Sequence, residues 1–222
     1  DNAYTFGGRL LRDKAWFFGS YRYTNREDDV AALDTNQFLR SVANTQHQGF
    51  AKASWAVTRD DLVSFTYLSD PTEISGRRDR NISNARDRAR EQGGHRFLGN
   101  YTRVWGNTLL EVMANKHNGE VTDLSAIRNS RNDVLFQTAD QRVLTDEQVG
   151  GFGRDLIDQR DNSAVRLSLQ RIFGAHTVKA GFSWENPKNF RDTVYVDGQG
   201  RYNLAPQYNG RNITAAQILR SA

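Results

Sequence analysis

Four pairs of strand-like segments run along the chain, and a turn of only a few residues joins the two members of each pair. The short turns lie at Leu11–Lys14, Thr58–Asp61, Gly106–Thr108 and Gly174–Ala175. Long polar stretches separate the pairs, roughly over Thr24–Gln46, Ser69–Gly94, Asn118–Asp161 and from Asn186 to the end. This alternation predicts an all-β, antiparallel up-and-down meander with every short turn at one end of the sheet. Transmembrane β-barrels are built in this way, with short periplasmic turns and long extracellular loops.

Apolar and polar residues alternate within the pairs, which is the pattern of strands with one apolar face. Residues 62–68, for example, read Leu-Val-Ser-Phe-Thr-Tyr-Leu. We expect eight strands of about 8–11 residues, near the length of a tilted membrane strand. The side chains predicted to face lipid are Val63, Phe65, Tyr67, Val165, Leu167, Leu169, Val178 and Phe182. The alternating polar side chains predicted to face a wet lumen include Arg22, Lys52, Arg166 and Lys179.

The tryptophans cluster near the predicted strand ends. Trp16, Trp55 and Trp105 lie beside or close to short turns, and Trp184 lies toward the opposite end. This placement predicts aromatic belts at two membrane–water interfaces. The alternative is a soluble β-sandwich in which the same aromatic residues form the core. Loops beyond about 12–15 residues are uncommon in compact soluble domains, so the long stretches favour the membrane interpretation.

Composition limits the protein class. The 222 residues suffice for one domain, which we assign to residues 1–222, with 186–222 mostly extracellular loop. Mean hydropathy is −0.73, and no apolar run approaches the roughly 20 residues of a membrane helix. That excludes a helical membrane protein but not a barrel, whose strands show only alternate residues to lipid. The absence of cysteine excludes disulfides and Cys-based metal sites.

No set of residues predicts catalysis, so we expect no enzyme activity, no cofactor and no metal. Gly151-Phe-Gly153 is too short for a dinucleotide-binding motif. Asp60-Asp61 lies in a tight turn, where aspartate is favoured in any case. His47, His95 and His117 fall at the loop-side ends of the predicted strands, where a polar rim is favoured over a metal contact. His176 starts a strand at the opposite end.

The densest basic stretch runs over residues 77–90 and holds six arginines against two aspartates. Arginine grips phosphate or carboxylate with two parallel hydrogen bonds. We expect this stretch to be a solvated external loop, and a candidate contact for lipopolysaccharide phosphates or an anionic ligand. Nucleic acid is disfavoured because no aromatic residues are interleaved for base stacking. The six residues are Arg77, Arg78, Arg80, Arg86, Arg88 and Arg90.

The first hairpin resembles that of a known family. Tyr4-Thr-Phe-Gly-Gly-Arg-Leu-Leu-Arg-Asp-Lys-Ala-Trp-Phe-Phe-Gly-Ser-Tyr21 is similar to the early barrel of TonB-dependent receptors, particularly the Oar-like branch. The family usually has proline where this chain has Arg9. Asn100-Tyr-Thr-Arg-Val104 with Thr108-Leu-Leu-Glu111, and His176-Thr-Val-Lys-Ala-Gly-Phe182, are similar to later hairpins of that family.

The resemblance implies part of an outer-membrane barrel of about 22 strands that surrounds a plug domain and is energised by the TonB complex. The expected function is energy-coupled uptake of a scarce nutrient such as a siderophore, glycan or peptide. We expect an excised or incomplete piece, without plug or closing strands, that leaves an open sheet with two unpaired edges. Its expected surroundings are outer-membrane lipid and lipopolysaccharide. A passive porin or adhesin-like barrel, or less readily a soluble all-β binding module, stays open as an alternative.

Overall fold

The computed structural model describes residues 1–32, 36–76, 78, 80, 87–125, 134–135, 154–195 and 202–203. Within these residues nine strands form one antiparallel sheet. The strands are β1 (Asn2–Leu11), β2 (Ala15–Ala31), β3 (Phe38–Ala56), β4 (Asp61–Ser69), β5 (Thr72–Ser75), β6 (Arg88–Trp105), β7 (Thr108–Ser125), β9 (Arg154–Phe173) and β10 (His176–Tyr195). The short strands β8 (Val134–Leu135) and β11 (Tyr202–Asn203) pair with each other in parallel.

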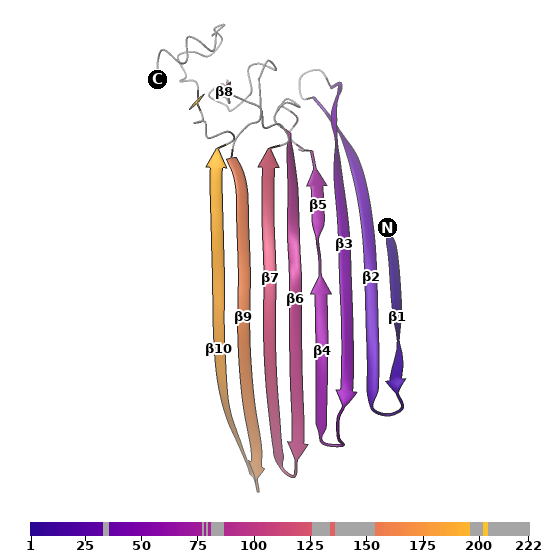
Figure 1. Ribbon diagram of the computed structural model, residues 1–222, viewed down its shortest axis with the longest axis vertical. Coiled ribbons are helices and arrows are strands. Elements are labelled where there is room, and N and C mark those ends of the chain that lie inside the picture. Colours follow the sequence, from indigo (N-terminus) through magenta and orange to yellow (C-terminus); the bar gives the residue numbers. More distant parts are fainter. Residues whose placement is uncertain are drawn as a thin grey trace.

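The main sheet is an antiparallel meander, as the sequence predicts. Its order is β1-β2-β3-β4-β6-β7-β9-β10, with β5 pairing β3 and β6 beyond the end of β4 (Figure 1). In the described part of the chain β1 pairs only with β2 and β10 only with β9, so the sheet is open and has two edges.

No helix among the described residues is long and apolar enough to cross a membrane.

All four predicted short turns are present, and they lie at the same end of the sheet (Figure 1). Two of them are two-residue connections that begin with a glycine at positive φ, 52° at Gly106 and 56° at Gly174. Asp13 takes a φ of 57° in the first turn, a conformation that aspartate tolerates better than most residues. These local geometries explain why the short connections could be recognised from turn chemistry.

The strands are longer than the sequence predicts. β2, β3, β6, β7, β9 and β10 each span 17–20 residues rather than about 8–11. They continue well into the predicted long loops, and β10 carries the ladder through residues 186–195, which we expected to be loop. The extensions are mostly polar and their few apolar residues, such as Val30, Val42 and Phe190, do not form the regular alternation by which a strand is recognised. Their backbone groups nevertheless pair in the same ladders.

One strand of the meander is broken at a proline. Pro71 lacks a backbone N–H, and it lies between β4 and β5. The carbonyl oxygen of Pro71 still accepts a hydrogen bond from the backbone N–H of His47 at 2.9 Å. β5 keeps the register of β4 against both β3 and β6, so the two pieces occupy a single position in the sheet.

The sheet has almost no core of its own. Among the described residues, the buried hydrophobic side chains are only Ala15, Val30 and Val42. Large apolar side chains are exposed along most strands; Phe182 is 62% exposed and Phe65 is 49% exposed. A single sheet therefore presents both of its faces to its surroundings, and the chemistry of those faces carries the functional argument.

Candidate functional site

The ladder registers assign each strand side chain to one of two faces, because residues directly opposite each other in an antiparallel pair point to the same side. A single row crosses seven strands and holds mostly apolar residues. It consists of Ala15, Trp55, Val63, Tyr101, Val112, Leu167 and Phe182. We call the face that carries this row the banded face.

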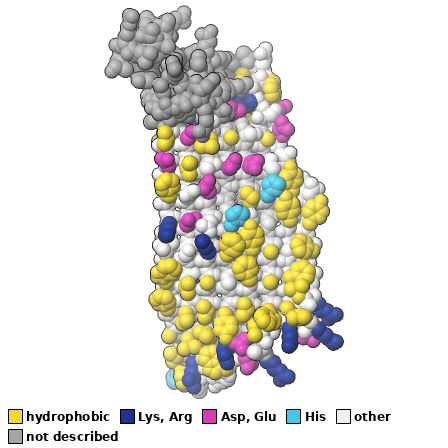
Figure 2. All heavy atoms as spheres, viewed as in Figure 1, with side chains coloured by type: hydrophobic (Ala, Val, Ile, Leu, Met, Phe, Trp, Pro, Cys, Tyr) yellow, Lys and Arg dark blue, Asp and Glu magenta, His cyan; other side chains and the backbone are white. Residues whose placement is uncertain are grey.

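All eight side chains predicted to face lipid lie on the banded face. Val63, Phe65 and Tyr67 alternate along β4 on this face. The ladder pairs that continue through β6, β7, β9 and β10 place the other five side chains on the same face. Figure 2 shows hydrophobic side chains gathered over the half of the sheet next to the short turns, and acidic side chains toward the opposite end. On β9 the charged residues that bracket the apolar stretch of this face are Arg171 and Asp161.

The predicted aromatic belt divides between the two faces. Trp55, Trp105 and Trp184 lie on the banded face. Trp16 pairs with Ser54, so it lies on the opposite face and cannot share the turn-side belt with Trp55 and Trp105. The β-bulge between Arg9 and Leu11, in the adjacent strand, accompanies the first turn. The neighbours Ala15 and Phe17 lie on the banded face, so Trp16 between them points to the other side. Its closeness to a turn therefore did not show which face it occupies.

Tyrosine–histidine pairs mark the far edge of the apolar stretch on the banded face. The Tyr21 hydroxyl lies 2.6 Å from Nδ1 of His47, and the Tyr67 hydroxyl lies 2.8 Å from Nδ1 of His95. The prediction that these histidines lie at strand ends is wrong, because β3 and β6 continue past them. His117 lies on the opposite face, so the three histidines do not form one rim. The described residues contain no group of three or more His, Cys, Asp or Glu that is placed to hold a metal ion.

Beyond these pairs the banded face turns acidic. A hollow of about 430 Å³ there is bordered by Glu73, Glu91, Glu120 and Asp161. Glu73 and Glu91 are direct cross-strand partners, an arrangement of like charges that costs stability. The carboxylate of Glu120 accepts a hydrogen bond from the Gln159 side chain at 2.7 Å.

The opposite face is rich in cations, and we call it the basic face. Its Arg and Lys side chains in the described strands are Arg9, Arg22, Arg26, Arg40, Lys52, Arg88, Arg90, Arg96, Arg160, Arg166, Lys179 and Arg191. Its acidic side chains in the described strands are Asp28, Glu111, Asp123, Asp158 and Glu185. All four side chains predicted to face a lumen, at positions 22, 52, 166 and 179, are in this set.

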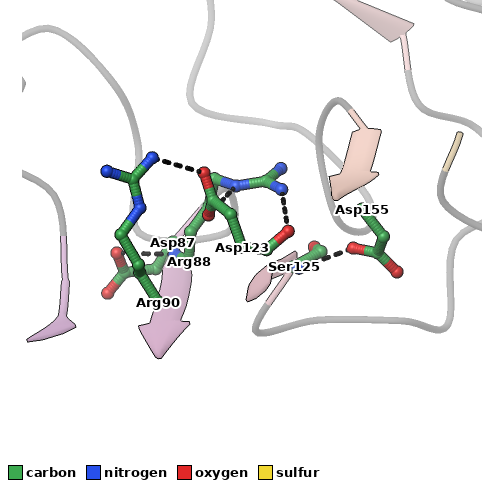
Figure 3. Close-up of polar contacts among 6 residues, drawn as sticks. All are labelled: Asp87, Arg88, Arg90, Asp123, Ser125 and Asp155. Atoms are coloured by element: carbon green, nitrogen blue, oxygen red, sulfur yellow. Dashed lines mark hydrogen bonds and ion pairs between the residues drawn. The ribbon is translucent and has the colours of Figure 1, made fainter. Parts of the chain in front are cut away.

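The arginine-rich stretch is organised differently from the predicted loop. Arg88 and Arg90 lie in β6, and both bind Asp123 of β7, at 2.8 and 3.2 Å respectively (Figure 3). The Arg88 side chain is only 7% exposed and also donates to the backbone carbonyl of Asp123 at 2.7 Å. These two arginines are therefore part of the sheet and bind a neighbouring strand, and the prediction that they lie in a loop is wrong.

The remaining arginines of this stretch follow the same trend where they are described. Arg78 forms an ion pair with Asp28 at 2.7 Å, and Arg80 donates to the carbonyl of Ala31 at 2.9 Å. Arg77 and Arg86 lie outside the described residues. Hydrogen bonds from Arg78, which has the larger effect, and from Arg26 hold the pKa of Asp28 below its ordinary value of 3.8. Near the ends of β9 and β10, the hydrogen bond from Arg160 lowers the pKa of Asp158 in the same way.

A groove of about 620 Å³ on the basic face was not predicted from the sequence. Arg22, Gln48, Phe50, Arg96 and His117 are among the residues that line it. Arg96 and His117 are direct partners in the β6–β7 ladder. The signal was present in the sequence, because these two residues are equally far from the turn at Gly106-Asn107 and a two-residue turn pairs equidistant residues.

The chain matches no protein-family model, no curated protein and no solved structure.

Proposed function

We propose that this sheet is a wall of the β-barrel of a TonB-dependent outer-membrane transporter, which takes up a scarce nutrient with energy supplied through the TonB complex. The observation that carries the membrane part is the uncovered apolar stretch on the banded face. With three buried hydrophobic side chains among the described residues, a soluble sandwich would lack a core. Lipid is the covering that an exposed apolar band of this kind requires.

The height of the apolar stretch supports this environment. Arg171 and Asp161 are ten residues apart on β9 (171 − 161 = 10). At about 3.4 Å per residue the interval is roughly 34 Å along the strand. With a tilt of about 40° it covers roughly 26 Å of the membrane normal, close to the ~25 Å apolar band of outer-membrane barrels.

The two faces also differ in polarity, as a barrel wall with lipid on one side and water on the other requires. Lumen-facing positions of a large barrel are polar, because they meet water, a plug or a passing solute. Lys52, Arg166 and Lys179 on the basic face have no hydrogen-bond or ion-pair partner among the described residues. Exposed cations of this kind suit a wet interior and would be costly against lipid.

Energy-coupled uptake rests on the resemblance of the first hairpin to TonB-dependent receptors. In that arrangement the sheet supplies part of the pore wall, the connections at the far end meet the ligand, and a plug domain gates the lumen. The edges at β1 and β10 would pair with further strands, because unpaired backbone groups in lipid cost several kcal/mol each. The lipid-facing side chains keep the protein in the membrane and have no catalytic role in this proposal.

Reading the gene outward in both directions tests the proposal. We expect a signal peptide, a TonB box and a plug-like domain upstream, and further alternating strands downstream. A start codon directly before Asp1 and a stop codon directly after Ala222 would contradict it. A barrel without a plug would instead support a passive porin. Recovery of the gene product without detergent would support a soluble binding module.

A further inference from the structure

The groove on the basic face combines an apolar floor with an open cation. Phe50 of β3, Leu68 of β4 and Arg96 of β6 are successive members of one ladder row, and all three line the groove. The ring of Phe18 meets Phe50 edge-on at a centroid distance of 5.8 Å and holds it against the sheet. The floor and the cation are therefore fixed side by side by strand pairing.

Two glycines leave the space above Arg96 and His117 open. In the next row, Gly94 of β6 pairs with Gly119 of β7, and neither contributes a side chain. The carboxylate of Asp70, which also lines the groove, accepts a hydrogen bond from the backbone N–H of Gly94 at 2.9 Å. A Cβ on Gly119 would lie 3.0 Å from Nε2 of His117, and a Cβ on Gly94 would collide with the backbone of β7. Side chains at these positions would partly fill the groove.

Two side chains of the groove, Arg96 and His117, have hydrogen-bonding groups without a partner among the described residues. Arg96 is exposed and makes no hydrogen bond or ion pair with any described residue. Nδ1 of His117 is buried and has no hydrogen-bond partner among them either. Arg22, across the groove, is by contrast bound to Asp1 at 2.5 Å. Of the groove's cationic and imidazole side chains, Arg96 and His117 therefore keep hydrogen-bonding capacity that Arg22 has already used.

We infer that this groove binds a small anion whose carboxylate or phosphate group meets Arg96 and His117 and whose flat apolar body lies on Phe50 and Leu68. Arginine offers paired N–H donors that match either oxyanion. The volume of about 620 Å³ lies within the range of small-molecule sites. The inference rests on the proposed function, since it names the substrate class that the lumenal wall would recognise.

Calorimetric titration of the full-length gene product in detergent, after isolation of outer membranes, tests the inference. The probes are benzoate and phenyl phosphate, with benzylamine as a probe of similar body and opposite charge. We expect both anions to bind and benzylamine not to bind. Tighter binding of phenyl phosphate would identify a phosphate ligand, and tighter binding of benzoate would identify a carboxylate ligand. Equal binding of all three probes, or binding of none, would overturn the inference.

Two arginine variants make the test specific. Arg96→Gln is expected to weaken anion binding at least tenfold, because a charge-assisted hydrogen bond is lost. Arg96→Lys, which keeps the charge but not the paired donors, should fall between it and the wild type. Arg166→Gln is the matched control, because Arg166 lies on the same face outside the groove and also lacks a partner among the described residues. Equal effects of Arg96→Gln and Arg166→Gln would show a diffuse charge effect and no site.

The two proposals fail separately. Heat-modifiable electrophoretic mobility and outer-membrane fractionation report the barrel, whereas the titrations report the groove. A protein that folds in outer membranes and supports energy-coupled uptake without binding either anion overturns the groove alone. A protein that binds the anions but fractionates without detergent overturns the transporter.

Discussion

The half of the sheet next to the short turns and the half beyond it share the same strands but differ in side-chain chemistry. In the first half Leu167 lies between Val112 and Phe182 on the banded face; Leu167 and Phe182 are exposed and Val112 is half-buried. In the second half, on β6 and β7, the side chains of Arg88 and Asp123 bind each other across the ladder. The backbone pairing is continuous through both halves.

This difference separates two causes that are often treated as one. Backbone hydrogen bonds maintain a strand wherever the ladder continues, whether or not its side chains are apolar. Side-chain composition then decides the medium in which each part of the ladder is stable. In the turn-proximal half one face is largely apolar, as the proposed membrane wall requires, and in the far half both faces are mostly polar.

The largest expected effect comes from placing a charged side chain in the apolar half, which tests whether the two halves differ in their surroundings. If the sheet is the proposed barrel wall, Leu167→Arg should destabilise the full-length protein by about 2–4 kcal/mol, the cost of an arginine near the bilayer midplane on a lipid-facing position. Ile157→Arg is the matched control, because Ile157 lies on the same strand and the same face ten residues away (167 − 157 = 10). It should cost about 0–1 kcal/mol. Urea titration in phospholipid vesicles measures both values, and equal losses would remove the distinction between the halves.

The same division explains what could be predicted from the sequence. The turn-proximal half was predictable because apolar alternation and turn residues report directly on strand faces and ends. Val63, Phe65 and Tyr67 illustrate this, since their spacing alone placed them on one face. The far half was not predictable, because residues 118–125 and 154–161 show no apolar alternation and their pairing depends on partners distant in sequence. Trp16 was grouped with tryptophans that lie on the other face of the sheet. Arg88 was assigned to a loop although it lies in a strand.

A second test concerns what holds the polar half together. Arg88→Gln should lower the free energy of unfolding by about 1.5–3 kcal/mol, because it removes charge-assisted hydrogen bonds to a half-buried carboxylate. Arg90→Gln, which touches the same Asp123 from a side chain that is 44% exposed, should cost less than about 1 kcal/mol. Urea titrations at low and high salt give both values. Equal losses would mean that burial does not distinguish the two arginines.

A third test concerns the backbone where the two halves join. Gly94→Ala should cost about 1–3 kcal/mol, since the added Cβ would lie 2.9 Å from Cα of Gly119 and closer still to the carbonyl oxygen of Asn118. Gly99→Ala on the same strand is the control, because a Cβ there meets no atom within 4 Å. It should leave the unfolding midpoint unchanged or slightly raised. A neutral Gly94→Ala would show that β6 and β7 can separate at this point without loss.

The smallest expected effect is a pH-dependent change in stability that comes from Asp28 in the polar half. Hydrogen bonds from Arg78 and Arg26 hold the pKa of Asp28 below 3.8 in the folded chain. The unfolded chain therefore binds this proton first as the pH falls. The stabilisation is complete above about pH 5 and is lost progressively as the pH falls below about 4.

Asp28→Asn should accordingly lower the unfolding midpoint slightly at neutral pH and flatten its decline between about pH 5 and 3. Asp29→Asn is the neighbouring control, because Asp29 lies on the banded face and accepts a hydrogen bond from the Ser41 hydroxyl at 2.8 Å instead of binding arginine. Other carboxylates titrate in the same range, so the informative quantity is the difference between each variant and the wild type at each pH. Parallel curves for Asp28→Asn and the wild type would mean that the Arg26–Asp28–Arg78 contact adds no pH-dependent stability. The polar half would then depend on its backbone ladders and on the Arg88–Asp123 pair.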